Sequence, residues 1–459
     1  MSAFWIGRAW GHIPPGKRLS FSTTKDTSNG RPTSHRMRGR VLDENEMAFL
    51  RDTIYIYNAF NDSYLELLFL QRFWIKLSGM VPDWIAPCVL TCTGFTINVV
   101  TCLILLYYSP STGGDAPPWA FVLATIGVFA YQTLDGIDGK VAIANQNTQI
   151  EEVYDHGCDA ISTIFVTLEI SVAFQLGRYP MLNFLCLLVP SIAFFSTHWL
   201  CHIKHQMVFG RVDIAEAQFL MMAIHLLTAY FGQSMWHIHL VSVRGFQVAL
   251  VHIMVFGIIF GLLLAIFHNV NLAVLGAKTP LEKLGVRIPA RRGLRIWYPL
   301  VPIAALTVLA IWAFYFGYFV VSPTTFYITF GLAYAKVTIK LLMKNISHGT
   351  MELTDTALLP PLFIALNTLL SLILPTTALT WSLFLTAIDL GCYFSCASWD
   401  LRDALGLNIF SIKYPPGHPR SRNGPCGLYF HGLNKEDILR NPRANLPRGY
   451  NGDITFDFE

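Results

Sequence analysis

The sequence predicts an all-α polytopic membrane protein of about ten transmembrane helices, with its active site at the cytosolic membrane interface. Of the 459 residues, 53% are hydrophobic and 14% are charged, whereas a soluble domain carries about 25% charged residues. The mean hydropathy is +0.45. Four aspartates also gather at the ends of two apolar segments. So few charges cannot cover a water-exposed surface of this size, and lipid must therefore surround much of the chain.

Ten segments are long and apolar enough to cross a bilayer, which takes about 20 mainly apolar residues. They are residues 86–108, 117–134, 157–176, 180–200, 213–232, 247–269, 298–321, 324–343, 355–375 and 379–397. The loops after even-numbered segments carry ten Lys and Arg residues, and those after odd-numbered segments carry two. Because basic loops stay in the cytosol, we expect both termini and the aspartates to be cytosolic.

The remaining regions divide the chain into four parts. Residues 1–43 are basic and contain Pro14-Pro15, which favours a disordered cytosolic arm over a mitochondrial transit peptide of similar composition. Residues 44–85 contain apolar residues at helical spacing, mixed with charged residues, and this pattern predicts interfacial helices. Residues 86–400 form the ten-span membrane domain, and residues 401–459 form a polar cytosolic tail. The nine cysteines show neither a disulfide framework nor a zinc pattern.

The second and third segments are joined by a stretch with four aspartates. Asp135 and Asp138 are three residues apart, and Asp155 and Asp159 are four apart, so each pair lies on one face of a helix. Consecutive helices with a short connection tend to be antiparallel neighbours. The four carboxylates would then converge and repel one another unless a divalent cation neutralised them. Carboxylates suit Mg²⁺ or Mn²⁺, which in turn bind phosphate groups.

Small residues beside the aspartates favour a phosphate-containing ligand. Gly136, Gly139 and Ala142 leave room for a nucleotide near the backbone, and Lys140 is the nearest cation. The alternative is a solvated acidic loop, in which the glycines only allow close packing. Two pairs at helical spacing, both at a membrane boundary, favour the metal site, because unpaired acids beside apolar sequence are costly.

These residues resemble the CDP-alcohol phosphotransferases, whose signature is D-x-x-D-G-x-x-A-R-x8-G-x3-D-x3-D. The four aspartates, Gly139 and Ala142 match it. The stretches PDWIAP, YQTLD, DHGCD, THWL and FGRVDIAEAQ are similar to the eukaryotic choline/ethanolamine branch, and the resemblance covers roughly residues 45–410. The signature's Arg is replaced by Ile143 and its second Gly by Glu151, and the spacer has seven residues instead of eight.

The resemblance implies transfer of phosphocholine or phosphoethanolamine from its CDP ester to diacylglycerol, with release of CMP. Asp135, Asp138 and Asp155 would hold two Mg²⁺ or Mn²⁺ ions, and Asp159 would be a further ligand or the base for the diacylglycerol hydroxyl. The protein would lie in the endoplasmic reticulum or Golgi membrane. It would bind CDP-choline or CDP-ethanolamine, diacylglycerol and the bilayer, but no nucleic acid. The sequence leaves the preferred head group and a homodimer open.

Polar residues inside other predicted spans are candidates for the same site. His198, Glu216 and His225 lie in the fourth and fifth segments, and Asn98 lies in the first. The resemblance makes Glu216 and His225 candidate proton acceptors, and Asn98 is a candidate substrate contact. Hydrogen bonding between helices is the alternative role for each of them.

Three other functions compete with the active enzyme. The changes at Ile143 and Glu151 are compatible with a weakly active or inactive paralogue that binds CDP-alcohols or lipid as a regulator. A transporter would place its ion site near mid-bilayer and show related halves, and the sequence predicts neither. An aspartate-rich prenyl-transfer enzyme would repeat its D-x-x-D motif. That repeat is missing here, and the DHGCD match also argues against this class.

Overall fold

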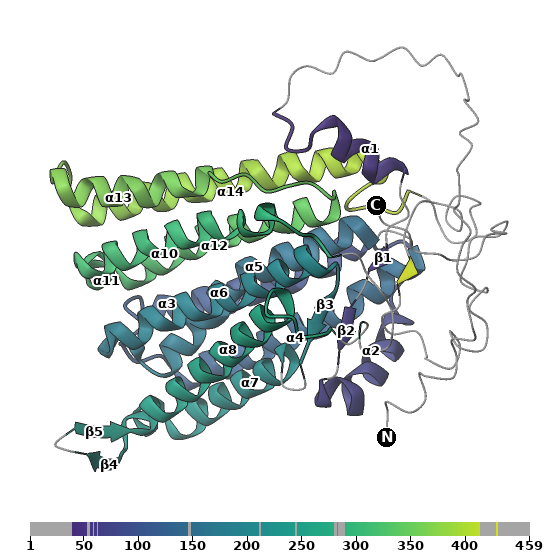
Figure 1. Cartoon of the computed structure of the whole chain (residues 1–459). Helices are drawn as coiled ribbons and strands as arrows, with labels where there is room; N and C mark the ends of the chain where they lie inside the picture. Colours follow the sequence, from purple (N-terminus) through teal and green to yellow (C-terminus); the bar gives the residue numbers. More distant parts are fainter. Residues whose placement is uncertain are drawn as a thin grey trace, which may run out of the picture.

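The computed structural model describes residues 39–52, 56–57, 59–61, 63–145, 148–210, 213–243, 246–279, 282, 290–413 and 428–429. The long helices run side by side as one bundle, with helices α1 and α2 at one end of it and the β4–β5 hairpin at the other (Figure 1). Most of the predicted basic arm and most of the polar tail lie outside the described residues, so those two assignments stay predictions.

Eight helices of the described chain are long and apolar enough to span a membrane. They are α3 (Pro87–Tyr108), α4 (Pro118–Asn145), α6 (Pro180–Lys204), α7 (Ile214–Phe231), α8 (Leu250–Ala273), α10 (Leu300–Tyr315) together with the short helix η6 (Leu294–Trp297) that precedes it, α12 (Pro323–Ile346) and α14 (Pro375–Leu405). The other two predicted spans are α5 (Thr148–Ala173), which carries the acidic residues, and α13 (Leu359–Leu370), which is shorter. The prediction of an all-α polytopic membrane protein is confirmed.

Several predicted boundaries are wrong by a few turns. Helix α4 continues past residue 134 to Asn145, and α5 already begins at Thr148. The residues between the two aspartate pairs contain no proline, so nothing in them ends a helix early. Helix α14 likewise extends to Leu405, past residue 397, where the last predicted span ends. Both aspartate pairs therefore lie within helices and are held by continuous backbone hydrogen bonding.

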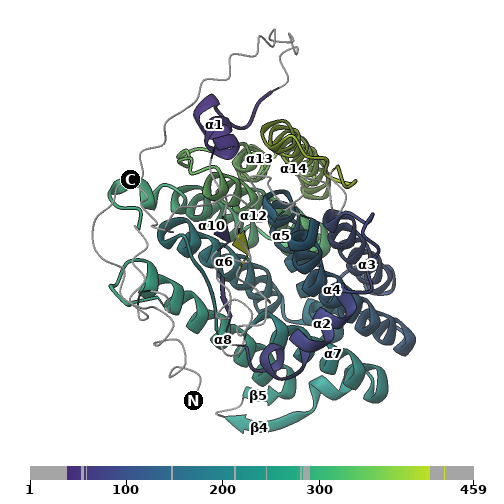
Figure 2. The same ribbon diagram turned by 90° about the vertical axis from the view of Figure 1, so that its right-hand side faces the viewer.

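Helix α5 lies at the centre of the bundle. It packs against α3, α4, α6 and α12, while α6 packs on α8 and α4 packs on α7 (Figures 1 and 2). One large hydrophobic core joins these helices, with Ile164, Leu168 and Val172 of α5 almost fully buried within it. Close helix–helix approach is helped by Gly331 of α12, where a Cβ would come within 2.7 Å of Ile164. The aspartates of α5 are thus anchored on a helix with a well-buried core face.

Short elements connect and cover the bundle. The segment predicted to form interfacial helices contains α1 (Glu44–Asp52), η3 (Glu66–Leu70) and α2 (Gln71–Ser78), and their place at a membrane interface stays a prediction. The remaining short helices are η4 (Leu176–Arg178), η5 (Gln233–His237), η6 (Leu294–Trp297), α11 (Tyr318–Val321) and η7 (Thr356–Leu358). The strands are β1 (Ile56–Tyr57), β2 (Ala59–Asn61), β3 (Met207–Phe209), β4 (His239–Val243), β5 (Phe246–Ala249) and β6 (Leu428–Tyr429). They form the parallel pairs β1–β6 and β2–β3 and the antiparallel pair β4–β5.

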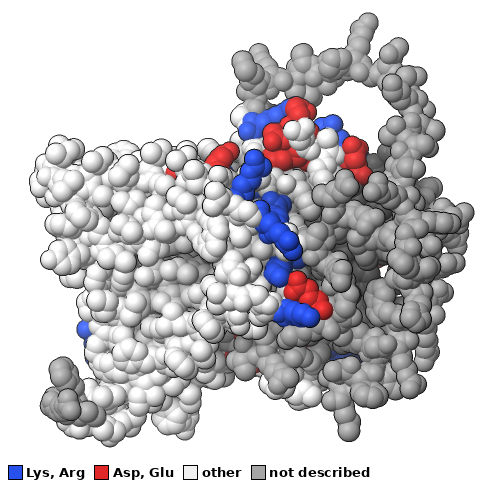
Figure 3. All heavy atoms as spheres, viewed as in Figure 1, with Lys and Arg blue, Asp and Glu red and all other residues white. Residues whose placement is uncertain are grey.

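Charged side chains concentrate at one end of the bundle. On the face shown in Figure 3, Lys and Arg form a band beside the grey region, whereas the surface over most of the helix length is uncharged. A buried ion pair lies between α12 and η7, where Lys336 Nζ is 3.1 Å from Asp355 Oδ1 and both side chains are almost fully buried. The concentration of surface charges at one end of the bundle is typical of helices whose middle parts face lipid.

Candidate metal centre and substrate cavity

The two aspartate pairs face each other across α4 and α5, as the sequence predicts. The nearest carboxylate oxygens of Asp135, Asp155 and Asp159 lie within 4.8 Å of one another. A second group, Asp138, Glu151 and Asp155, has the same spread, so Asp155 belongs to both groups. The antiparallel packing of two consecutive helices therefore brings all four predicted aspartates into one cluster, together with Glu151.

Neighbouring hydroxyl groups orient two of these carboxylates. Thr91 Oγ1 on α3 donates a hydrogen bond to Asp138 Oδ2 at 2.5 Å, and the Tyr131 hydroxyl on α4 donates to Asp159 Oδ1. In contrast, Asp135 Oδ1 and Asp155 Oδ1 are buried and have no hydrogen-bond partner among the described residues. Buried carboxylate oxygens without donors are expensive, and a divalent cation would satisfy them. The residues present therefore fit Mg²⁺ or Mn²⁺, which prefer oxygen ligands.

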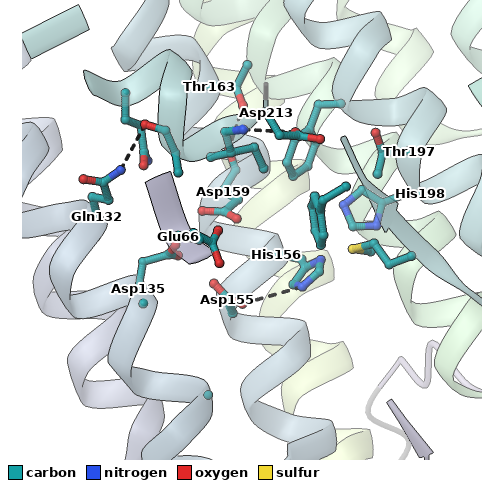
Figure 4. A pocket seen from close by; sticks show the side chains of 18 of the residues that line it. Glu66, Gln132, Asp135, Asp155, His156, Asp159, Thr163, Thr197, His198 and Asp213 are labelled. Carbon is teal, nitrogen blue, oxygen red and sulfur yellow. Dashed lines mark hydrogen bonds and ion pairs between the residues drawn. The ribbon is translucent and has the colours of Figure 1, made fainter. Parts of the chain in front are cut away.

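A cavity of about 300 Å³ adjoins the carboxylate cluster. Its lining includes acidic residues of α4 and α5, and Figure 4 shows Asp135, Asp155 and Asp159 pointing toward this space. Its lining also includes apolar residues of α6 and α8, namely Pro190, Ala193, Phe194, Leu262 and Ala265. The cavity thus has both anionic and apolar lining, and its volume is within the size range of small-molecule sites.

Comparison with known proteins gives a consistent result, although no family model matches the chain. The chain is 33% identical to "Cholinephosphotransferase 1" of Danio rerio over 353 residues, which cover 76% of this chain and 90% of the relative. It is 30% identical to "Cholinephosphotransferase 1" of Rattus norvegicus over 82% of this chain and 93% of the relative. An "Uncharacterized CDP-alcohol phosphatidyltransferase class-I family protein 2" of Dictyostelium discoideum is 28% identical over 83% of this chain and 89% of the relative.

The chain belongs to the CDP-alcohol phosphotransferase family. The aspartates that match the CDP-alcohol phosphotransferase signature are therefore the ones that converge on the cavity. Membership is also consistent with use of a divalent metal, for which the two carboxylate groups provide ligands.

The small residues of the signature have different surroundings. Gly136 and Gly139 both line the cavity, whereas Ala142 is fully buried and is not among its lining residues. A Cβ on Gly136 would lie 2.4 Å from the Trp74 indole, so Gly136 admits this α2 side chain. Lys140 Nζ donates to the Gly136 carbonyl at 2.8 Å and lies 5.3 Å from the centre of a Trp74 ring. Lys140 also lines the cavity, and its contact with a phosphate ligand stays a prediction.

Glu216, His225 and Asn98 do not line the cavity. Glu216 accepts hydrogen bonds from Ser63 Oγ at 2.8 Å and from the Leu65 backbone at 3.0 Å, and so connects α7 to the segment before η3. The His225 ring nitrogens and the Asn98 amide are buried without partners among the described residues. Their proposed catalytic and substrate-binding roles stay predictions.

Three other cavity residues were missed or left open by sequence reasoning. Glu66 of η3 lines the cavity, and Figure 4 shows it pointing to the same space as the aspartates. His156 and His198 pack edge to face with ring centres 5.1 Å apart, and His156 Nε2 lies 3.6 Å from Asp155 Oδ2. His156 lies within the DHGCD motif, which could have marked it. Glu66 has no such signal, because only the folding of the interfacial segment over α4 places it there.

Proposed function

We propose that this protein transfers phosphocholine from CDP-choline to diacylglycerol, forming phosphatidylcholine and CMP, and that CDP-ethanolamine is its second donor. The observation that carries the proposal is the cavity, which is lined both by carboxylates of α4 and α5 and by apolar side chains of α6 and α8. A nucleotide diphosphate and a lipid alcohol would need these two environments side by side. The names of the relatives support choline as the head group.

In the proposed reaction, the diacylglycerol hydroxyl oxygen attacks the phosphorus that carries choline. The bond from this phosphorus to the bridging oxygen breaks, CMP leaves with that oxygen, and the hydroxyl proton passes to a base. Two Mg²⁺ or Mn²⁺ ions would offset the negative charge of the diphosphate and of the leaving CMP. Asp135, Asp138 and Asp155 would hold them, and the signature makes Asp159 either a further ligand or the base.

The surrounding side chains position these groups. The Tyr131 hydroxyl holds Asp159 by a hydrogen bond to one oxygen, and Thr91 holds Asp138 in the same way. Such fixed orientation accounts for much of the catalysis in phosphoryl transfer, where the protein contributes positioning and electrostatics. Pro190, Phe194 and Leu262 would lie along the acyl part of diacylglycerol, because they are apolar residues of the cavity lining.

We also propose that the site faces the cytosol of an endoplasmic reticulum or Golgi membrane. The band of basic residues in Figure 3, at the bundle end that carries α1, supports this orientation. CDP-alcohols are soluble anions and would reach the carboxylates from that side. A homodimer remains a prediction from the sequence.

The test uses purified protein in lipid nanodiscs with CDP-[¹⁴C]choline, diacylglycerol and Mg²⁺ or Mn²⁺. We expect labelled phosphatidylcholine and an equal amount of CMP, with product lost in Asp155→Asn and retained in Asp403→Asn, which removes an exposed carboxylate on the same bundle. Parallel reactions with CDP-[¹⁴C]ethanolamine measure head-group preference. Turnover that survives Asp155→Asn unchanged would exclude the proposed site.

A regulatory paralogue is the second candidate, because Ile143 and Glu151 replace an Arg and a Gly of the signature. Losing an Arg removes a cation and a bidentate hydrogen-bond donor for the diphosphate. If the protein binds CDP-choline but forms no product, and Ile143→Arg with Glu151→Gly restores turnover, the paralogue is the better assignment.

A further inference from the structure

Glu151 is a buried carboxylate that the family signature does not explain. It lies on α5 one turn before Asp155, and its side chain is 1% exposed. Neither of its oxygens has a hydrogen-bond partner among the described residues. A buried carboxylate that is left unpaired costs several kcal/mol, so the position calls for a ligand that neutralises it.

The position of Glu151 beside two of the aspartates indicates that this ligand is a divalent cation. Glu151, Asp155 and Asp159 follow one another at intervals of four residues, which places them in a row along one face of α5. This row faces Asp135 and Asp138 on α4. The nearest oxygens of Glu151, Asp138 and Asp155 lie within 4.8 Å of one another. From this spacing, small side-chain rotations can bring one oxygen of each residue to about 2.1 Å from a common Mg²⁺.

Nearby cationic side chains do not form an ion pair with Glu151. Lys140 is the cation closest in sequence, and its ammonium group donates to the Gly136 carbonyl and lies against Trp74. In the described part of the chain, no ion pair joins Glu151 to a Lys or Arg side chain within 4.0 Å. A cation shared with Asp138 and Asp155 would neutralise all three acids.

We propose that Glu151 is a ligand of one divalent cation, in a site it forms with Asp138 and Asp155, where the family signature has a glycine. The proposal rests on the proposed function, since it assigns a fifth carboxylate to the same metal centre. Asp155 is then shared by the two cations, Asp135 and Asp159 complete one site, and Asp138 and Glu151 complete the other. The extra acid makes the second site bind its cation more tightly than four aspartates would.

The test is Mn²⁺ binding to the full chain in nanodiscs without substrate, followed by electron paramagnetic resonance of free Mn²⁺. We expect Glu151→Gln to weaken one of two binding sites at least about tenfold and Asp155→Asn to weaken both. Glu152→Gln is the matched control, because Glu152 is the next residue, is equally buried and has a buried oxygen without a partner, but is not in either carboxylate group. This control should bind Mn²⁺ as the unmodified protein does.

Thermal unfolding provides a second readout for each variant. Mn²⁺ should raise the apparent Tm of the unmodified protein and of Glu152→Gln more than that of Glu151→Gln. Equal Mn²⁺ binding by Glu151→Gln and the unmodified protein would overturn the ligand role, as would equal weakening by Glu152→Gln. Phosphocholine transfer is measured separately. Glu151-dependent Mn²⁺ binding without product would refute the proposed function alone, and product with Glu151-independent binding would refute the ligand role alone.

Discussion

Replacing Tyr131 by Phe should weaken catalysis and metal binding together. The Tyr131 hydroxyl donates to Asp159 Oδ1 and is held within a buried part of α4. A hydrogen bond to a charged group contributes about 1.5–3 kcal/mol, which corresponds to a change of roughly 10- to 150-fold in a rate or binding constant. Because the hydroxyl acts through Asp159, we expect kcat/KM for phosphocholine transfer to fall by a factor in this range. The Mn²⁺ concentration that gives half-maximal rate should rise.

The control is Tyr154→Phe, which removes a hydroxyl of the same kind. Tyr154 lies on α5 beside Asp155 in sequence, but its hydroxyl donates to Ser398 Oγ on α14 at 3.0 Å. Rates are measured over a Mn²⁺ series in nanodiscs, with apparent Tm recorded for each variant. Tyr154→Phe should lower stability without changing the Mn²⁺ dependence. If Tyr131→Phe has the same Mn²⁺ dependence as Tyr154→Phe, the hydroxyl does not position Asp159 for metal binding and the reasoning is wrong.

Three further changes test the surrounding structure. Lys336→Met should cost about 1–3 kcal/mol, because it removes one of the two cations beside Asp355 and leaves Lys340 3.1 Å away. Apparent Tm should fall by roughly 2–5 °C, and adding Asp355→Asn should reduce that fall. Burial lowers the pKa of His205 to about 3, below its unfolded value of about 6.5. The unfolded chain therefore binds more protons, and the free energy of unfolding should fall as the pH drops from about 6.5. Unfolding measured over a pH series should show a smaller fall for His205→Asn. Gly136→Ala should reduce both stability and turnover by displacing the α2 indole, whereas Gly391→Ala, which meets no atom within 4 Å, should do neither.

The sequence predicted the helix content and most of the spans because lipid imposes a simple rule. A segment surrounded by hydrocarbon must be apolar over about 20 residues, and α3, α8 and α10 follow this pattern throughout. The ends of α4 and α5 were harder to place, since a buried helix that carries carboxylates looks polar in the sequence. The aspartates indicated the site in the sequence, but their polarity also made the ends of α4 and α5 difficult to predict.

The same distinction applies to the candidate site. Two acid pairs at helical spacing on consecutive helices predicted the convergence of the four aspartates, because helix periodicity and a short connection fix that geometry. Glu66 and His198 come from elements whose position depends on tertiary packing, so local sequence could not place them beside Asp155. Glu216 was a candidate as an acid within a predicted span, and its carboxylate accepts hydrogen bonds from the segment before η3, contacts that the local sequence could not show.

Helix α2 and the preceding η3 lie beside this site and also expose apolar side chains. Trp74 is buried against Gly136, and Glu66 from the turn before α2 reaches the cavity. Phe69 of η3 and Phe73 of α2 are exposed, as expected of helices that lie in a lipid interface. A bilayer in contact with these exposed side chains would fix the height of η3 and α2, and so the position of Glu66 relative to the carboxylates.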